Sequence, residues 1–100
     1  MGGMQGKIPA VYIMSNRKNG TIYTGVTSNL LNRYSEHKNG IKSGFCSKYG
    51  CKSLVYYEFH EEMESAILRE KQLKGGSRKK KIELIETNNP NWLDLINKLV

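Results

Sequence analysis

The sequence has no long hydrophobic run, few cysteines and few acidic residues. None of its apolar segments approaches the roughly 18 to 20 residues of a membrane-spanning helix, and the start, MGGMQGKIPA, lacks the apolar core of a signal peptide. We therefore expect no membrane association and a cytoplasmic location, where the thiols of Cys46 and Cys51 are reduced. A zinc site is not expected, because His37 and His60 show no metal-ligand spacing to these cysteines.

The shortage of acidic residues leaves the chain strongly basic. Lys and Arg number 16 against 9 Asp and Glu, a formal net charge of +7. This balance favours a polyanionic partner, and charge alone leaves nucleic acid and an anionic membrane surface open. The 100 residues suit one core, so we expect a flexible N-terminus over residues 1–8 and one domain over residues 9–99. No repeat, phosphate-cradling glycine loop or nucleophile elbow is present, which excludes those enzyme classes.

Three segments rich in β-branched and aromatic residues predict strands. Ala10–Ser15 and Thr21–Thr27 are separated by the turn signal Asn19-Gly20, so we expect them to form a hairpin. The third segment, Ser53–Phe59, is the most apolar, and we expect it to be the central strand.

The length of the hairpin turn decides which residues face one another. A two-residue turn at Asn19-Gly20 and a four-residue turn starting at Arg17 both put Tyr12 and Tyr23 on one face of the sheet. The longer turn also places Tyr12 opposite Gly25. An odd-length turn would separate the two tyrosines.

A helix is expected directly after the second strand. Asn29 is a good N-cap, and the helix should run to about Lys38, before the stop signal Asn39-Gly40. Arg33 and His37 are four residues apart and therefore point the same way. The following segment, residues 41–49, is expected to be a surface loop.

A second helix is expected over Glu61–Lys74, with a carboxylate on its buried side. Glu70 lies seven residues after the first apolar position and in the middle of the apolar stripe. An ionised carboxylate there costs several kcal/mol unless it is paired or binds a cation. The stripe consists of Met63, Ala66, Ile67 and Leu73.

The C-terminal part predicts two further helices. Ser77 should cap a helix that starts with the basic run RKKK, and this run either contacts a phosphate backbone or is a solvated face. Asn89-Pro90 should open a last amphipathic helix. Its Trp92 is expected to pack in the core.

The polar groups of these elements include a base, a cation and a metal ligand, which phosphodiester hydrolysis requires. Taken with the motifs VYI, YTG, R-x-x-x-H and REKQLK, the sequence resembles the GIY-YIG nuclease superfamily. The likeness extends from about Pro9 to Trp92 and is closest to small stand-alone bacterial members. The candidate catalytic residues are Tyr12, Tyr23, Arg33, His37 and Glu70.

The resemblance implies an α+β (α/β) domain, a small three-stranded antiparallel sheet flanked by helices, that cuts DNA with Mg²⁺ or Mn²⁺. By its motifs, Tyr12 is the general base, assisted by His37, and Tyr23 positions the phosphate or the attacking water. Arg33 would bind the phosphate, and Glu70 would be the metal ligand.

The same resemblance suggests a structure-dependent endonuclease of the repair or recombination type, acting on branched, flap or nicked DNA, with a protein partner as a further option. A nucleic-acid-binding module with this fold and little cleavage is the alternative, because no asparagine between Ser77 and Glu86 matches the one that many relatives carry. A third interpretation is a protein-interaction domain with a basic surface. The residues expected to contact nucleic acid are Gly25, Lys74, Arg78, Lys79 and Lys80.

Overall fold

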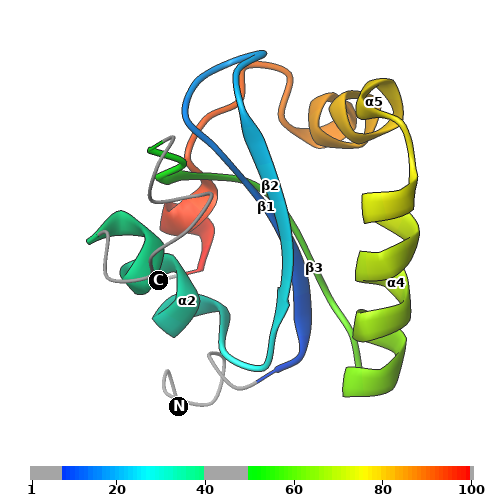
Figure 1. Ribbon diagram of the computed structural model, residues 1–100. Helices are drawn as coiled ribbons and strands as arrows, with labels where there is room; N and C mark the ends of the chain where they lie inside the picture. The colour runs from blue at the N-terminus through cyan, green and yellow to red at the C-terminus, as the bar shows by residue number, and fades with distance from the viewer. Residues whose placement is uncertain (1–7, 40–49, 100) are drawn as a thin grey trace.

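The computed structural model describes residues 8–39 and 50–99, which form a three-stranded antiparallel sheet with helices on both faces (Figure 1). This confirms the predicted fold class. The strands are β1 (Ala10–Ser15), β2 (Ile22–Thr27) and β3 (Ser53–Phe59), in the order β2-β1-β3. The expectation that Ser53–Phe59 is central is therefore wrong, and β1, buried along its whole length, takes that place. An apolar run indicates that both faces of a strand are covered; it does not say that both edges are paired.

The β1–β2 hairpin has the longer of the two turns considered above. Ser15 pairs with Ile22 and Asn16 N donates to Thr21 O at 3.2 Å, which leaves a four-residue turn from Arg17 to Gly20 and rules out the two-residue turn. The turn is closed by Gly20 N donating to Arg17 O at 2.9 Å, and Asn19 takes a positive φ of 58°, which asparagine tolerates better than most residues. The resulting register places Tyr12 directly opposite Gly25, as predicted for this turn.

The helices divide between the two faces of the sheet. On one face lie α2 (Leu30–Lys38) and the short 3-10 helix η1 (Leu95–Lys98), and on the other lie α4 (Met63–Gly75) and α5 (Arg78–Asn88) (Figure 1). Among the described residues, no helix is long and apolar enough to cross a membrane.

Two of the helix starts have the predicted caps. Asn29 Oδ1 accepts from Asn32 N at 3.0 Å, and Ser77 Oγ accepts from Lys80 N at 3.1 Å. The helix that was expected from Glu61 starts slightly later, as α4. The loop expected over residues 41–49, together with Gly40 and Cys46, lies outside the described residues.

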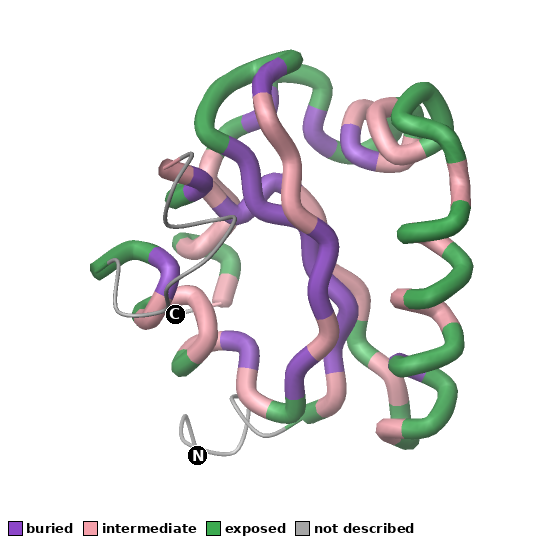
Figure 2. Tube along the Cα trace, viewed as in Figure 1, coloured by how far each residue is buried: buried purple, intermediate pink, exposed green. Residues whose placement is uncertain are grey.

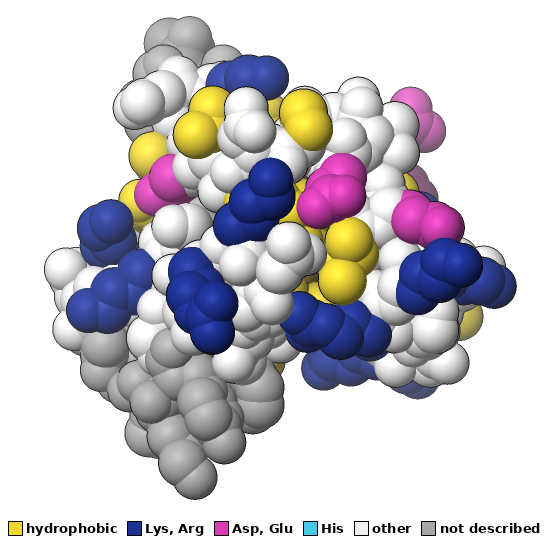
Figure 3. Space-filling model, turned by 90° about the horizontal axis from the view of Figure 1, so that it is seen from above, with side chains coloured by type: hydrophobic (Ala, Val, Ile, Leu, Met, Phe, Trp, Pro, Cys, Tyr) yellow, Lys and Arg dark blue, Asp and Glu magenta, His cyan; other side chains and the backbone are white. Residues whose placement is uncertain are grey.

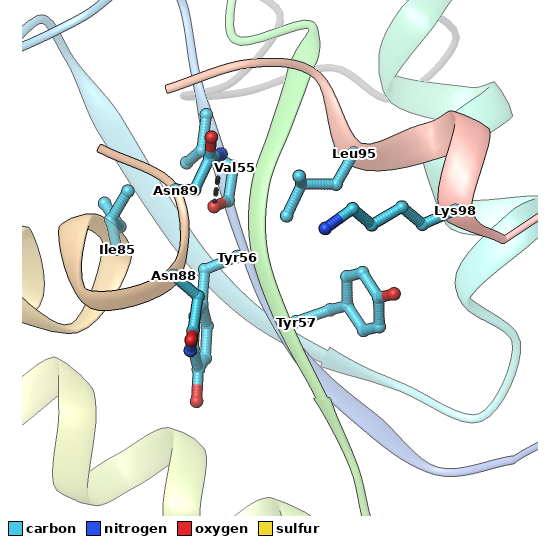
Figure 4. Close-up of a pocket in the computed structure, with 8 residues that line it drawn as sticks. All are labelled: Val55, Tyr56, Tyr57, Ile85, Asn88, Asn89, Leu95 and Lys98. Atoms are coloured by element: carbon cyan, nitrogen blue, oxygen red, sulfur yellow. Dashed lines mark hydrogen bonds between the residues drawn. The ribbon is translucent and has the colours of Figure 1, made fainter. Parts of the chain in front are cut away.

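The predicted last helix is wrong. After Asn89-Pro90 the chain turns through Trp92, whose φ is 56°, and forms only the single 3-10 turn of η1. Asn89 explains the departure, because its Nδ2 donates to Val55 O at 3.1 Å (Figure 4) and also to Leu93 O at 2.9 Å. These bonds tie the chain to β3 and compete with helix formation.

Alternate residues of β1 contribute to two separate apolar cores. On the α2 face, Tyr12 and Met14 pack with residues that include Leu30 and Leu54. On the α5 face, Ile13 packs with Val55, Ile85 and Trp92, which confirms the core position predicted for Trp92. The buried positions run along the sheet between the helices (Figure 2).

Candidate active site

Three of the predicted site residues meet on the α2 face of the sheet. Tyr12 Oη lies 3.1 Å from His37 Nε2, a buried hydrogen bond between residues far apart in the sequence. The ring of Tyr23 is 6.2 Å from that of Tyr12 and 5.5 Å from that of His37, measured between centroids. The prediction that the two tyrosines share a face is confirmed, and α2 places its histidine against both.

Gly25 makes room for this cluster. A Cβ atom at Gly25 would lie 2.5 Å from Tyr12 Oη and 2.6 Å from Tyr12 Cζ. The reason is that Gly25 pairs with Tyr12 across the two strands and the phenol ring lies over it. Any larger side chain would displace the Tyr12 ring from His37. The side chain that comes closest to Gly25 is therefore a tyrosine of the same chain.

Lys74 approaches the Tyr23 ring from α4, and Glu70 is joined to the cluster through its ion pair with Lys74. Glu70 Oε2 accepts from Lys74 Nζ at 2.7 Å, and Lys74 Nζ lies 5.8 Å from the centre of the Tyr23 ring. The hydrogen bond to Glu70 and the nearby negative charge raise the pKa of Lys74, although burial opposes this rise. The site thus combines a carboxylate, an ammonium group and a phenol.

The burial of α4 agrees only partly with the predicted stripe. The Glu70 side chain is 12% exposed, Ala66 is buried, and Met63 and Leu73 are half-buried. Ile67 is 37% exposed, so its predicted place in the core is wrong. The helix rests on its Ala66 side, which turns Ile67 out toward solvent. The sequence left two outcomes for this carboxylate, a paired side chain or a bound cation, and the structure pairs it with Lys74.

The remaining predicted cations occupy different surroundings. Arg33, one helical turn before His37, places its Nε 3.2 Å from Glu36 Oε1. Arg78 donates from its guanidinium to Gly20 O at 2.6 Å and to Asn19 O at 3.0 Å, and so joins α5 to the hairpin turn. The side chains of Lys79 and Lys80 are exposed. Figure 3 looks onto the end of the molecule that carries the β1–β2 turn and α5, and shows Lys and Arg side chains in dark blue on that surface.

The donor set at Glu70 suits a metal that keeps most of its water. Within residues 8–39 and 50–99, no three His, Cys, Asp or Glu side chains come together as a metal-binding group. A single, partly buried carboxylate supplies the hard oxygen ligand that Mg²⁺ and Mn²⁺ prefer. Glu70 therefore fits such an ion as one ligand, with Lys74 as the cation that now neutralises it.

A second polar network, which the sequence analysis missed, holds α4 to β3. Glu58 accepts from Tyr56, from His60 at 2.6 Å and from Arg69 Nε at 3.1 Å. Burial alone would raise the pKa of Glu58, but these hydrogen bonds and the Arg69 charge outweigh it and lower that pKa. Burial and the bond to Glu58 raise the pKa of Tyr56 to about 12. The only sign of this network in the sequence was a basic residue, Arg69, directly before Glu70 on the predicted helix.

Asp94 is also a hub that the sequence analysis missed. Its carboxylate accepts from Tyr34 Oη at 2.7 Å, from Leu54 N at 3.2 Å and from Ile96 N at 3.2 Å. Burial and the bond to Asp94 raise the pKa of Tyr34 to about 12, so this phenol remains a donor. Asp94 thus connects α2, which carries His37, to β3 and η1.

The cavity shown in Figure 4 is separate from these groups. It has a volume of about 220 Å³, lies beside β3, and has Tyr57, Asn88 and Lys98 at its rim. None of the predicted catalytic residues lines it. Asn88, at the end of α5, is one of the residues that line this cavity.

Comparison with known proteins gives consistent matches. The sequence model of the GIY-YIG catalytic domain matches residues 8–83. A UPF0213 protein of Clostridium perfringens is 38% identical over 77 residues, which cover 77% of this chain and 82% of that protein. A UPF0213 protein of Syntrophus aciditrophicus is 36% identical over 76 residues, which cover 68% of this chain and 79% of the relative. The solution NMR structure of a UPF0213 protein from Bacillus halodurans matches with a TM-score of 0.51 and 30% identity, covering 81% of this chain and 85% of that one.

Proposed function

The chain belongs to the GIY-YIG catalytic domain family, and we propose that it is a divalent-metal-dependent endonuclease that hydrolyses phosphodiester bonds of DNA. The observation that carries this proposal is the contact between Tyr12 and His37 beside Tyr23, with Glu70 reaching the same cluster through Lys74. A fold alone does not imply an activity. Here the phenol of Tyr12, the ammonium group of Lys74 and the carboxylate of Glu70, for which we propose the roles of proton acceptor, cation and metal ligand, are linked through contacts with Tyr23 and with one another.

The buried hydrogen bond provides a path for the proton of the attacking water. Tyr12 Oη accepts this proton while its own proton passes to His37 Nε2, 3.1 Å away, so that the histidine ends as the imidazolium. The water oxygen forms a bond to phosphorus, one ester P–O bond breaks, and the leaving oxygen takes a proton from solvent. Tyr23, half-buried beside both rings, positions the phosphate.

Cationic side chains stabilise the charge that develops on the phosphoryl oxygens. Arg33 releases Glu36 to bind the phosphate, and Lys74 lies at the same edge beside Tyr23. Glu70 would hold a divalent ion, which would supply Lewis-acid stabilisation of the same charge. Lys79 and Lys80, exposed on α5, are available to the DNA backbone.

Access to Tyr12 requires a movement. The side chain is 0% exposed, so its oxygen meets a water molecule only when substrate binding opens the cluster. Such a dependence on substrate suits an enzyme that recognises DNA structure, because no base-specific contact is needed to trigger it. We propose branched, flap or nicked DNA of the kind formed in repair or recombination as the substrate.

The test replaces the metal ligand and a matched control on the same helix. Glu70→Gln and Glu64→Gln both remove one carboxylate from α4, but Glu64 is exposed and outside the cluster. Nicking of single-stranded, duplex, flap and branched DNA is measured with Mg²⁺, with Mn²⁺ and with EDTA. We expect the Glu70 variant to lose at least about 100-fold in rate, since a bound metal stabilises the transition state by several kcal/mol.

The same assay decides between cleavage and binding alone. The ion pair between Lys74 and Glu70 favours the alternative, a binding module with little activity, because the ammonium neutralises the proposed metal ligand. Retarded migration of these DNAs without metal-dependent nicks would establish that alternative. Cleavage by the Glu70 variant at the unaltered rate would refute the assignment of the site.

A further inference from the structure

The cavity beside β3 lies against the free edge of the sheet. It is lined by three consecutive residues of that strand, Val55, Tyr56 and Tyr57. Tyr56 packs toward the α5 face and Tyr57 toward the α2 face, so a cavity that touches both follows the strand edge. Asn88 lies on one side of the strand and Lys98 on the other (Figure 4). None of the described residues that line the cavity carries a carboxylate.

The backbone of Tyr57 presents an unused donor and an unused acceptor at this edge. His60 N donates to Pro9 O at 2.8 Å, which fixes the hydrogen-bonded pairs of β3 and β1 at alternate residues. Tyr56 and Glu58 therefore bond to β1, whereas the N–H and C=O of Tyr57 point away from the sheet. Within residues 8–39 and 50–99, no hydrogen bond engages these two outward groups.

The start of the same edge is closed by side chains. Leu54 N donates to Asp94 Oδ1 at 3.2 Å, and Val55 O accepts from Asn89 Nδ2 at 3.1 Å. The strand edge therefore opens only beyond these residues, where water satisfies the groups of Tyr57 until a ligand with a matching donor and acceptor replaces it.

The side chains around the cavity suit an aromatic anion. Lys98 forms an ion pair with no carboxylate of the described residues, so its charge is available to a ligand. The amide of Asn88 takes part in no hydrogen bond of the described part of the chain and offers both a donor and an acceptor. Leu95 adds apolar surface.

A further cavity of about 270 Å³ continues along β3. It is lined by Ile8, Phe59 and Leu99, together with Tyr57 and Lys98, which also line the first cavity. The first cavity has a volume of about 220 Å³. Pockets for drug-sized ligands start at about 300 Å³, so a ligand of that size would extend from one cavity past Lys98 into the other.

We propose that these two cavities bind a free adenine nucleotide with a single phosphate. Adenine carries an acceptor directly beside a donor, N7 and the N6 amino group. This pair matches the N–H and C=O of Tyr57, and asparagine is a common partner of adenine, so Asn88 reads a further edge of the base. Leu95 packs on the base, and Lys98 binds the phosphate.

The nucleotide site is distinct from the candidate active site. Tyr57 is the cross-strand partner of Tyr12, but none of the residues proposed for cleavage lines either cavity. The inference therefore goes beyond the proposed function, and its test contains no cleavage step.

The experiment titrates the full chain with adenosine monophosphate (AMP) and measures Kd by isothermal titration calorimetry in the presence of EDTA. Adenosine lacks the phosphate, guanosine monophosphate (GMP) has two acceptors, N7 and O6, at the corresponding edge, and a short oligoadenylate tests for the end of a strand. The variants are Lys98→Gln and Asn88→Ala. Their matched controls are Lys52→Gln and Asn97→Ala, at exposed residues outside both cavities. Circular dichroism verifies that each variant is folded.

We expect AMP to bind with a Kd of about 1 mM or tighter, and adenosine and GMP to bind about tenfold more weakly. Lys98→Gln should weaken AMP by about tenfold and leave adenosine unchanged, because it removes only the phosphate contact. Asn88→Ala should weaken AMP and adenosine by the same factor. Both control variants should bind AMP as the unaltered chain does.

Amide hydrogen exchange followed by NMR tests the contact with the strand edge. Saturating AMP should slow the exchange of the outward N–H of Tyr57 by at least about tenfold, while the N–H of Glu58, already bonded to β1, should not change.

Absence of AMP binding in the millimolar range overturns the inference, as does unchanged exchange at Tyr57. Equal affinities of Lys98→Gln and Lys52→Gln for AMP, or of the unaltered chain for AMP and GMP, also contradict it. Tighter binding of the oligoadenylate than of AMP, abolished by Lys98→Gln, would assign the cavities to the end of a strand and refute a free ligand.

Discussion

Replacing Gly25 with alanine tests the central packing contact of the site. The added Cβ would lie 2.5 Å from Tyr12 Oη, whereas ordinary contacts begin at 3.4 Å. The phenol must therefore move by about 1 Å to reach normal van der Waals separation. Because the Tyr12 side chain is 0% exposed, it has no open space to move into, and the move takes it away from His37.

The expected cost follows from two opposing effects. Overpacking a closed core typically costs about 1 to 3 kcal/mol, while replacing glycine inside a strand regains roughly 0.5 to 1 kcal/mol of backbone entropy. We expect Gly25→Ala to lower the free energy of unfolding by about 1 to 2 kcal/mol, which corresponds to roughly 4 to 16 °C in Tm. Cleavage should fall by about 100-fold, because a displacement of this size misplaces the proton acceptor.

Urea unfolding followed by circular dichroism measures the stability, and the nicking assay measures the activity. Gly75→Ala is the control, since a Cβ at this position meets nothing within 4 Å. At the end of α4 it should stabilise the protein slightly, by about 0.5 to 1 kcal/mol. The clash itself is isolated by repeating Gly25→Ala in a Tyr12→Leu background, which lacks the phenol atoms that the new methyl group would touch.

In the Tyr12→Leu background the cost of Gly25→Ala should vanish or become a gain. The explanation is wrong if Gly25→Ala is as costly in that background as it is in the unaltered chain. It is also wrong if the single substitution leaves both stability and cleavage unchanged, because the phenol would then have moved freely.

Two further predictions concern the polar networks. Since folding lowers the pKa of Glu58, this carboxylate stabilises the protein above its unfolded pKa of about 4.3 and the stabilisation is lost as the pH falls through the folded value. Urea unfolding between pH 3 and pH 7, a range set around that value, measures the effect. Glu58→Gln should have a lower free energy of unfolding than the unaltered chain near neutral pH, and this difference should shrink as the pH falls. A difference that stays constant with pH would contradict this reasoning. Asp94→Ala should lower the free energy of unfolding by about 1 to 3 kcal/mol, because Leu54 N and Tyr34 Oη lose their acceptor. Thermal unfolding measures this loss. Asp94→Asn should lower the melting temperature less than Asp94→Ala does, because it keeps one acceptor oxygen. Equal melting temperatures for the unaltered chain and both variants would refute the role of Asp94.

Local sequence signals predicted the elements that local interactions determine. Asn29 and Ser77 cap their helices with their own side chains, so the residue type and its position were enough. The alternation of β1 likewise placed Tyr12 and Tyr23 on one face, although the sequence left the choice between two turns to the structure. The apolar run of β3 could not identify the central strand, since pairing at both edges is a long-range property.

In the candidate site, too, local sequence signals predicted some features and only the packing of the elements decided others. A carboxylate in the predicted apolar stripe of α4 indicated that Glu70 is either paired or binds a cation, and in the structure it pairs with Lys74. Which edge of the sheet this pair approaches depends on how α4 packs on the strands, and only the structure brings Lys74 over Tyr23. Arg78 looked like a ligand for phosphate in the sequence, whereas the carbonyl groups of the hairpin turn bind it in the fold.

The sequence by itself determined the strands, the helix caps and the charge that favours nucleic acid, because each depends on residues close together or on composition. The tertiary structure alone decided the strand order, the 3-10 turn in place of a last helix, the contact between Tyr12 and His37, and the approach of Lys74, the partner of Glu70, to the Tyr23 ring. These features depend on contacts between segments tens of residues apart, and such contacts form only when the elements pack.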